Sequence, residues 1–392
     1  MEPSDTYDRF LGPAINWLIR SDIRNKNLSE PNYGGFNSGY NLRKKSYSLV
    51  YCEITGYAIS LLTNLYHLEK NRDFLEFARD AGRFLLAMQY KGTNKKISGA
   101  FPQGYSFLQK DIVYDFYSFD TAVCISALVD LFKETGEQKF FASAKIAGEW
   151  LINQMQYGDG AFKAMYNFNA QDFSKIKKWF GDRGCLHAKN AIGLLKLFDV
   201  TGDASFKVSA TEVCDWVLHL QKGNGAFVAT EGELYVFTHA HCYATEGLLY
   251  AHLSLNNQKY LDAALESGKW LIQAQNTDGS LYRYYYKNSF IPIKMTDATS
   301  QALRIWLILY HLTREKDYLD AAQKSAKFLI NMQCQKKNDP NAFGGLFYQS
   351  HAVWKFRYIY PLINAWPTMF AIHALYGLKN LDKSGYEKMG VF

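Results

Sequence analysis

Proline is scarce in this chain: 8 of 392 residues, roughly 2% against a usual ~5%. Few prolines and few turn-forming clusters favour long helices over many short strands. No apolar run approaches the ~18 residues that a membrane-spanning helix needs. The opening residues, MEPSDTYDRF, carry three acidic side chains and lack the apolar stretch of a secretory signal. We therefore expect a cytoplasmic protein without a membrane span.

Several chemical motifs are also missing. The six cysteines include no CxxC pair, which predicts reduced, buried thiols rather than a disulfide framework. The chain has no P-loop, no GxGxxG after a strand and no GxSxG elbow, so we predict no cofactor. Basic residues are scattered rather than clustered, which argues against a nucleic-acid partner. The net charge of +7 is modest and compatible with an acidic glycan.

What the chain has in abundance is aromatic and apolar side chains arranged in a repeat. It is 48% hydrophobic and 16% aromatic, enough for a sizeable core. An apolar triplet recurs at intervals of 54 to 67 residues and ends an amphipathic segment each time. A glutamine follows five of the six triplets, and a glycine turn usually comes next. The triplets start at Trp17, Phe84, Trp150, Trp216, Trp270 and Phe328.

A second kind of helix, apolar nearly all round, alternates with the first; EITGYAISLLTNLY and DATSQALRIWLILY are examples. A helix that is apolar on all sides belongs inside a larger assembly. Six amphipathic and six apolar helices predict an all-α fold, an (α/α)6 toroid with an inner and an outer ring. We expect one domain over residues 1–392; an open α-solenoid is the alternative.

The predicted connections differ sharply in length. Links from inner to outer helix are tight, whereas links from outer to inner helix are long, such as residues 91–116 and 276–294. All long loops should therefore lie on one face, at the N-termini of the inner helices. Loops on a rigid scaffold commonly carry function, and helix N-termini favour anions. We expect the active site on this face.

Aligning the inner helices makes Thr55, Thr121, His187, His241, Thr299 and Ala365 equivalent. The titratable side chains near these helix starts are the candidate catalytic residues. Aspartates there are also ordinary N-caps, and a lone histidine is usually a core residue. Carboxylates inside apolar helices, in contrast, are costly without a partner or a function. The candidate catalytic set is Glu53, His187, His239, His241, Tyr243 and Asp297.

Arginine, tyrosine and further carboxylates supply candidate substrate contacts, because aromatic rings stack on sugar faces and arginine binds carboxylates bidentately. The candidate binding residues are Asp120, Arg183, Glu246, Arg283, Tyr286, Arg357 and Tyr360. A zinc site made of Cys185, His187, His239 and His241 is the alternative use of those side chains. Their spacings match none of the familiar zinc templates, so we predict no metal.

Segments such as YCEITGYAISLL, YSFDTAV and HCYATEGLLYA resemble the inner-helix starts of carbohydrate-active toroids. These are the six-hairpin glycosidases, unsaturated glucuronyl hydrolases, uronate lyases and the helical domain of D-glucuronyl C5-epimerases. The DxDD motif of terpenoid cyclases, which share the glutamine–glycine turns, is absent. The resemblance is one of architecture and implies a polysaccharide or oligosaccharide substrate.

The leading hypothesis is therefore an enzyme that removes the C5 proton of a hexuronic acid in an acidic glycan and epimerises it. His187, His239, His241 and Tyr243 are the candidate proton carriers, and Arg183 and Arg283 the candidate carboxylate clamps. Glu53 and Asp297 would orient an imidazole or act as base. Lyase cleavage, and a glycoside hydrolase using two of Glu53, Asp120, Glu246 and Asp297, are alternatives. A third is a glycan-binding toroid without activity.

Overall fold

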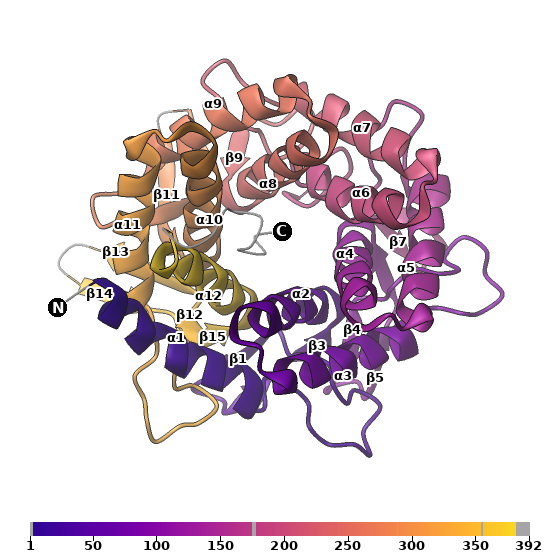
Figure 1. The fold of residues 1–392 in the computed structure, drawn as a ribbon, viewed down its shortest axis with the longest axis horizontal. Coiled ribbons are helices and arrows are strands. Elements are labelled where there is room, and N and C mark those ends of the chain that lie inside the picture. Colours follow the sequence, from indigo (N-terminus) through magenta and orange to yellow (C-terminus); the bar gives the residue numbers. More distant parts are fainter. Residues whose placement is uncertain (1–2, 175–177, 288, 354–355, 382–392) are drawn as a thin grey trace.

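The computed structural model describes residues 3–174, 178–287, 289–353 and 356–381, and it forms a closed ring of helices (Figure 1). The predicted (α/α)6 toroid is confirmed. The inner ring consists of α2 (Cys52–Glu69), α4 (Ser118–Thr135), α6 (Asn190–Thr201), α8 (Thr238–Leu255), α10 (Thr296–Thr313) and α12 (Ala365–Lys379). The outer ring consists of α1 (Pro3–Arg20), α3 (Arg72–Met88), α5 (Gln138–Trp150), α7 (Ala204–Leu218), α9 (Gln258–Ala274) and α11 (Lys316–Asn331). A 3-10 turn at Cys185–Lys189 precedes α6, and a π-helical segment at Leu151–Met155 extends α5.

Burial follows the two helix types. On α10 every residue from Thr296 to Leu309 is buried, whereas on α9 the buried positions form one face that includes Tyr260, Ala264 and Leu271. The inner helices are covered on all sides by their neighbours, and the outer helices keep one face in water. The six cysteines lie buried and unpaired, as predicted.

The tight links between inner and outer helices share one stop signal. Five inner helices end at a residue in the left-handed conformation, whose N–H bonds to the carbonyl four residues earlier. Gly136 and Gly202 adopt it without a side-chain penalty. Asn71, Asp203 and Asn257 then cap the following outer helices with their side chains.

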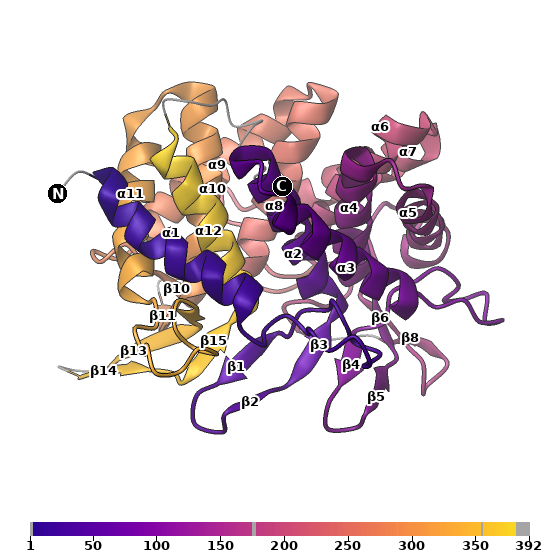
Figure 2. The same cartoon turned by 60° about the horizontal axis from the view of Figure 1, so that its bottom comes forward.

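The long links contain short strands, which the sequence did not predict. They gather on one face of the ring, below the helices in Figure 2. Their pairing gives four small antiparallel sheets among the described residues. The strands are β1 (Gly39–Asn41), β2 (Ser46–Tyr47), β3 (Leu49–Tyr51), β4 (Gly104–Ser106), β5 (Asp111–Val113), β6 (Asp115–Tyr117), β7 (Met165–Asn167), β8 (Asp172–Ser174), β9 (Tyr235–Phe237), β10 (Leu281–Tyr286), β11 (Ser289–Met295), β12 (Leu346–Phe347), β13 (Gln349–Val353), β14 (Phe356–Ile359) and β15 (Leu362–Asn364).

The repeated glutamine and glycine hold each turn against the next outer helix. Gln221 Nε2 donates to the carbonyl of Gly225 (3.1 Å) and to that of Ala263 on α9 (2.8 Å). Gln89, Gln156, Gln275 and Gln333 make the same pair of contacts.

The glycines have φ between +83° and +95°. A Cβ at each would lie 2.1–2.8 Å from a carbonyl oxygen of the next outer helix. Only glycine satisfies both conditions. They are Gly34, Gly99, Gly160, Gly225, Gly279 and Gly344.

Two residues beyond five of these glycines, the backbone N–H donates to a side chain of the next inner helix. In four repeats it donates to a threonine hydroxyl at the fourth position of that helix: Thr55, Thr121, Thr299 or Thr368. Thr368, not Ala365, is therefore the equivalent residue of α12, which corrects the sequence alignment by three positions.

Segments far apart in the chain close the ring. Gln333 donates to the carbonyl of Phe10 (2.9 Å), and the Trp17 indole N–H donates to that of Asn341 (2.9 Å). On the strand-bearing face β1 pairs with β15, with Gly39 opposite Asn364.

Candidate active site

Side chains spaced four and three residues apart on α8 and α10 line one side of the ring axis. On α8 these are His239, Tyr243 and Glu246, and on α10 they are Asp297, Gln301 and Arg304. This spacing keeps them on one helix face. The first member of each series lies at the strand-bearing mouth, and the later members lie one and two turns deeper.

His239 is the axial histidine, and its two ring nitrogens differ. Nδ1 hydrogen-bonds to Gln301 Oε1 and lies 3.9 Å from Asp297 Oδ2. Nε2 makes no hydrogen bond with any described residue. Because an amide oxygen only accepts, Nδ1 carries the proton and Nε2 keeps its lone pair. Burial lowers the pKa of His239, although Asp297 opposes the shift, so the ring is neutral near pH 7.

A buried ion cluster fixes this tautomer from below. Gln301 Nε2 donates to Glu246 Oε2 (3.2 Å), which orients the amide so that its oxygen faces His239. Lys189 contacts the same oxygen at 2.5 Å, and Arg304 contacts Oε1 at 3.0 Å. Burial alone would raise the pKa of Glu246, but Arg304 and Lys189 outweigh it and hold that pKa below its usual value. Glu246 therefore supports His239 through Gln301, and we leave it out of the substrate-binding set.

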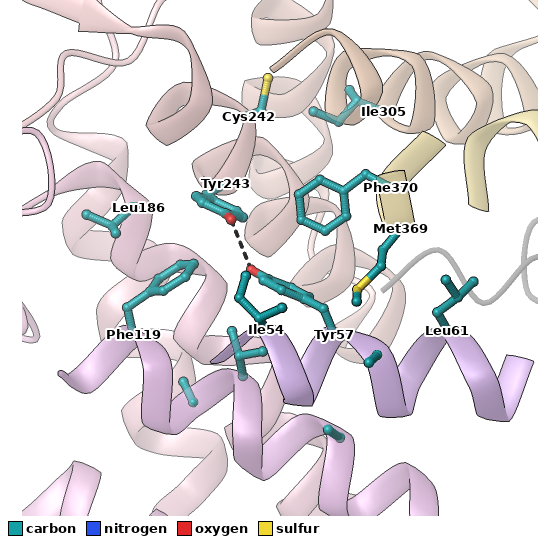
Figure 3. Close-up of a cluster of buried hydrophobic side chains, with 14 of the residues drawn as sticks. Ile54, Tyr57, Leu61, Phe119, Leu186, Cys242, Tyr243, Ile305, Met369 and Phe370 are labelled. Carbon is teal, nitrogen blue, oxygen red and sulfur yellow. Dashed lines mark hydrogen bonds between the residues drawn. The ribbon is translucent and has the colours of Figure 1, made fainter. Parts of the chain in front are cut away.

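Aromatic side chains form a floor between the mouth and this cluster (Figure 3). The hydroxyl of Tyr57 on α2 donates to that of Tyr243 on α8 across the axis (3.1 Å). Phe370 packs edge-on against Tyr57, and Tyr243 lies against the His239 ring with centroids 4.4 Å apart. Tyr243 is 1% exposed, and burial raises its pKa well above the usual value. It forms the floor beneath His239 and stays protonated.

Two carboxyl groups lie at the mouth on the other side of the axis. Burial raises the pKa of Asp120 to about 7, and the Tyr51 hydroxyl opposes this shift. Burial, with the negative charge of Asp120 next in importance, raises the pKa of Glu53 well above its usual value, against Lys189 and Tyr57. Asp120 Oδ2 is buried and has no hydrogen-bond partner among the described residues. Two neighbouring carboxyl groups with raised pKa values retain a proton near neutrality.

Asp297 and Arg283 complete the mouth beside His239. Asp297 is 1% exposed; its Oδ1 accepts from the N–H of Ala298 (2.6 Å), and its Oδ2 has no hydrogen-bond partner in the described chain. Burial, followed by the charge of Asp297, raises the pKa of Tyr348, and the nearby Arg283 opposes the shift. The Nε of Arg283 is buried without a described partner. Its guanidinium lies 5.8 Å from the centroid of Phe237, next to His239.

An open cleft of about 670 Å³ leads to this mouth. Its walls come from the loop before α6 and from β9, β10 and β11. Trp179 connects the cleft to the axis, because it stacks on Phe237 (centroids 4.3 Å apart) and meets His239 edge-on at 5.8 Å. The lining residues are Lys178, Trp179, Phe180, Tyr235, Arg283, Tyr284, Tyr286, Ser289, Phe290 and Ile291.

His241 lies in the wall between the inner and outer rings, away from the axis. Its Nδ1 accepts from the N–H of Phe227 (3.0 Å), the bond that threonine makes in four other repeats. Its Nε2 faces the Ser267 hydroxyl at 2.8 Å. Burial lowers the pKa of His241 to about 3. We therefore assign it a structural role.

His187 is also buried in the wall. Its Nε2 lies 3.2 Å from the carbonyl of Gly181, and its Nδ1 lies 3.4 Å from the Ser118 hydroxyl. Burial lowers its pKa to about 4. The fold satisfies both nitrogens, so we leave His187 out of the proposed catalytic set.

The remaining binding candidates differ in position. Arg183 pairs with Asp159 at 2.7 Å and with Glu231 at 3.6 Å, so its charge is already matched. Tyr286 lines the cleft and is 46% exposed. Tyr360 is 40% exposed and does not line that cleft. The side chain of Arg357 lies outside the described residues.

Sequence reasoning missed Gln301, Lys189 and Trp179. The first two could have been found by extending the helical spacing inward from the mouth, since Gln301 follows Asp297 by one turn. Trp179 lies in an irregular loop, where no periodicity indicates direction. Among the described residues, no three or more His, Cys, Asp or Glu side chains lie close enough together to hold a metal ion. Within the same residues, no helix is both long and apolar enough to cross a membrane.

Comparisons with known proteins place the fold. No family model and no curated protein sequence matches the chain. Solved structures do match over nearly the full length. A sugar epimerase from a ruminal bacterium aligns with TM-score 0.76 at 12% identity, covering 96% of this chain and 99% of the other.

Two further matches are another epimerase and a hydrolase. Cellobiose 2-epimerase from Spirochaeta thermophila aligns with TM-score 0.76 at 14% identity, covering 97% and 96% of the two chains. An unsaturated glucuronyl hydrolase from Bacillus sp. GL1 aligns with TM-score 0.69 at 13% identity, covering 97% and 98%. The chain thus shares the (α/α)6 toroid of carbohydrate-active enzymes, as its sequence predicted.

Proposed function

We propose that this protein is a carbohydrate-active enzyme that transfers the C5 proton of a hexuronic acid in an acidic glycan and thereby epimerises that carbon. One observation carries the proposal: two titratable groups suited to act as base and acid lie on inner helices on opposite sides of the axis (Figure 1). His239 lies on α8 and Glu53 on α2, and the Tyr57–Tyr243 hydrogen bond joins these two helices one turn deeper. Epimerisation needs a proton carrier on each face of the sugar ring.

In the proposed reaction, Arg283 binds the carboxylate of the uronate through charge-assisted hydrogen bonds. His239 Nε2 takes the proton from C5, the C5–H bond breaks, and its electron pair moves into the carboxylate as an enediolate. Arg283 stabilises the charge that develops there. The protonated member of the Glu53–Asp120 pair then gives its proton to the opposite face of C5. Exchange with water afterwards returns a proton to the carboxyl pair and removes one from His239.

Each group has the protonation state that this reaction requires near pH 7. The pKa of His239 is lowered by burial, so the ring is a neutral base. The pKa of Asp120 is raised to about 7 and that of Glu53 well above its usual value, so the pair can donate. Environments that separate the pKa values of two groups in this way are typical of acid–base catalysis.

Solvent exchange tests the proposal directly. The protein is incubated in D₂O with oligosaccharides that alternate glucuronate and an N-acetylhexosamine, and C5 is followed by NMR. We expect deuterium at C5 and a second uronate epimer, and we expect both to disappear in His239→Gln. An unsaturated, ultraviolet-absorbing product would instead indicate a lyase. Absence of deuterium from every uronate glycan tested would contradict the proposal.

Glycoside hydrolysis is a second candidate because Glu53 and Asp120 lie on neighbouring inner helices and influence each other's charge. One would protonate the leaving oxygen, and the other would act as nucleophile or activate water. New reducing ends without deuterium at C5 would favour this reaction. Affinity for the glycan with neither product would favour the binding toroid.

A further inference from the structure

The tips of β10 and β11 carry a platform of exposed aromatic and apolar side chains beside the active-site mouth. Tyr286 and Ile291 are 46% and 45% exposed, line the 670 Å³ cleft and share one face of the hairpin, because Ile291 pairs with Tyr284, the second residue before Tyr286. Exposed apolar side chains that line one cleft mark a site of interaction.

Contacts on the opposite face and at the edge of the hairpin hold the platform in place. On the opposite face Phe290, which pairs with Tyr285, stacks on Tyr282 with centroids 4.4 Å apart and planes within 7°. The Tyr285 hydroxyl donates to the carbonyl of Ala274, which ties this face to the end of α9. At the edge, β10 pairs with β9, with Tyr286 opposite Tyr235. A rigid aromatic surface loses little entropy when a flat ligand stacks on it.

The charge of the cleft indicates the ligand. Lys178 and Arg283 are the charged side chains among its described lining residues, which include no aspartate or glutamate. Aromatic faces stack on the apolar faces of sugar rings, and an arginine and a lysine bind their acidic groups. Trp179 lines the same cleft and meets the His239 ring edge-on, so a sugar ring on the platform would lie near the reacting sugar.

We infer that the β10–β11 platform is an outer subsite for a neighbouring unit of an acidic oligosaccharide, so that the enzyme acts on a glycan chain and not on a free uronic acid. The inference rests on the proposed function for the position of the reacting sugar. The platform itself requires only that an acidic oligosaccharide bind.

Binding affinity against chain length tests the platform without any turnover. Isothermal calorimetry on His239→Gln would compare glucuronic acid with a disaccharide and a tetrasaccharide in which glucuronate and an N-acetylhexosamine alternate. We expect the tetrasaccharide to bind at least tenfold more tightly than the monosaccharide. Tyr286→Ala should remove most of that gain and leave the monosaccharide affinity unchanged. Leu108→Ala is the matched control, because Leu108 is 94% exposed at the tip of another hairpin, between β4 and β5.

Carboxyl-reduced tetrasaccharides, which keep the rings and lose the acid groups, should bind at least tenfold more weakly. Equal affinity for all chain lengths, equal losses in Tyr286→Ala at every length, or no affinity for any oligosaccharide would overturn the inference. Concentration-dependent dimerisation abolished by Tyr286→Ala would also overturn it, because the platform would then bind a second copy of this chain. Length-dependent binding without deuterium at C5 would keep the platform and reject the epimerase.

Discussion

Histidine occurs both on the axis of the ring and in the wall between its two helix layers, but its ring nitrogens have different partners in the two places. His239 and His241 are two positions apart on α8, yet one faces the axis and the other faces the wall. In the wall both nitrogens of His241 are satisfied by the fold. On the axis one nitrogen of His239 is oriented and the other has no described partner. A histidine whose lone pair the fold leaves unused is the better candidate for proton transfer.

Replacing His239 should have the largest effect on activity. We expect His239→Gln to lower kcat by about 10³–10⁴-fold, because removing a positioned base forfeits proton transfer from C5. Its melting temperature should stay within about 3 °C of the wild type, since Nε2 contributes no hydrogen bond to the fold. Deuterium incorporation measures the first quantity and calorimetry the second. A fully active variant would place the base elsewhere on the axis.

Replacing either carboxyl group of the Glu53–Asp120 pair should have the second-largest effect on activity. Asp120→Asn and Glu53→Gln should each lower kcat by about 10²–10³-fold. Wild-type activity should fall as the pH rises through about 7, because Asp120 loses its proton there. A pH–rate profile without a limb near this value would argue against the pair as the acid.

The same carboxyl group has a consequence for stability. Its pKa is higher in the folded than in the unfolded chain, so the unfolding free energy should fall as the pH rises from about 4 to about 7. Asp120→Asn should remove this loss and be more stable than the wild type above pH 7, which urea unfolding at several pH values would measure.

His241 in the wall should affect stability instead. We expect His241→Ala to lose about 2–4 kcal/mol, from a cavity and an unsatisfied Phe227 N–H. His241→Thr should recover at least half of this, because threonine accepts the equivalent bond in four other repeats. Urea unfolding measures both variants. If threonine restores nothing, the shared hydrogen bond is not what stabilises this position.

For His241 in the wall, the free energy of unfolding should change with pH in the direction opposite to that expected for Asp120. Burial lowers the pKa of His241 to about 3, below its value in the unfolded chain. His241 therefore contributes stability above pH ~6.5, and this contribution is lost as the pH falls toward about 3. His241→Thr should reduce this acid sensitivity.

Replacing two glutamines, one on the axis and one in the wall, should have the smallest effects, and the two variants should differ in which property changes. Gln301→Met on the axis should lower kcat about 10-fold and shift the low-pH limb that His239 sets in the pH–rate profile, because the tautomer is no longer fixed. Gln221→Met in the wall should leave kcat unchanged and lower the unfolding free energy by about 1–2 kcal/mol, through two lost hydrogen bonds. Equal effects of both on kcat would erase the distinction between axis and wall.

The sequence predicted the ring because its repeat has a physical cause at each position. The glutamines and glycines recur where every turn meets the next outer helix, and a substitution there would break a hydrogen bond or introduce a clash. The strands of the mouth were missed because most are two to five residues long. Only the run LYRYYYKNSFIPIKM was aromatic and β-branched enough to indicate a hairpin.

The site was predicted only in part. Periodicity identified the depth of Glu53, His239 and Asp297 along their helices but not the direction in which each histidine points. His241 occupies the threonine position of the repeat, and that equivalence was itself a signal of structural use. The sequence could not show that Asp159 and Glu231 match the charge of Arg183, because tertiary folding brings these loop residues together.

The seam between α12 and α1 determines when the mouth can take its final shape. The bonds across it join residues more than 300 positions apart, so they form only after the chain has been synthesised beyond Gln333 and Asn341. The sheet that contains β1 and β15 spans this seam and leads directly into α12. Nascent chains would thus carry stacked hairpins long before the mouth is complete, and the proposed activity could begin only when the ring has closed.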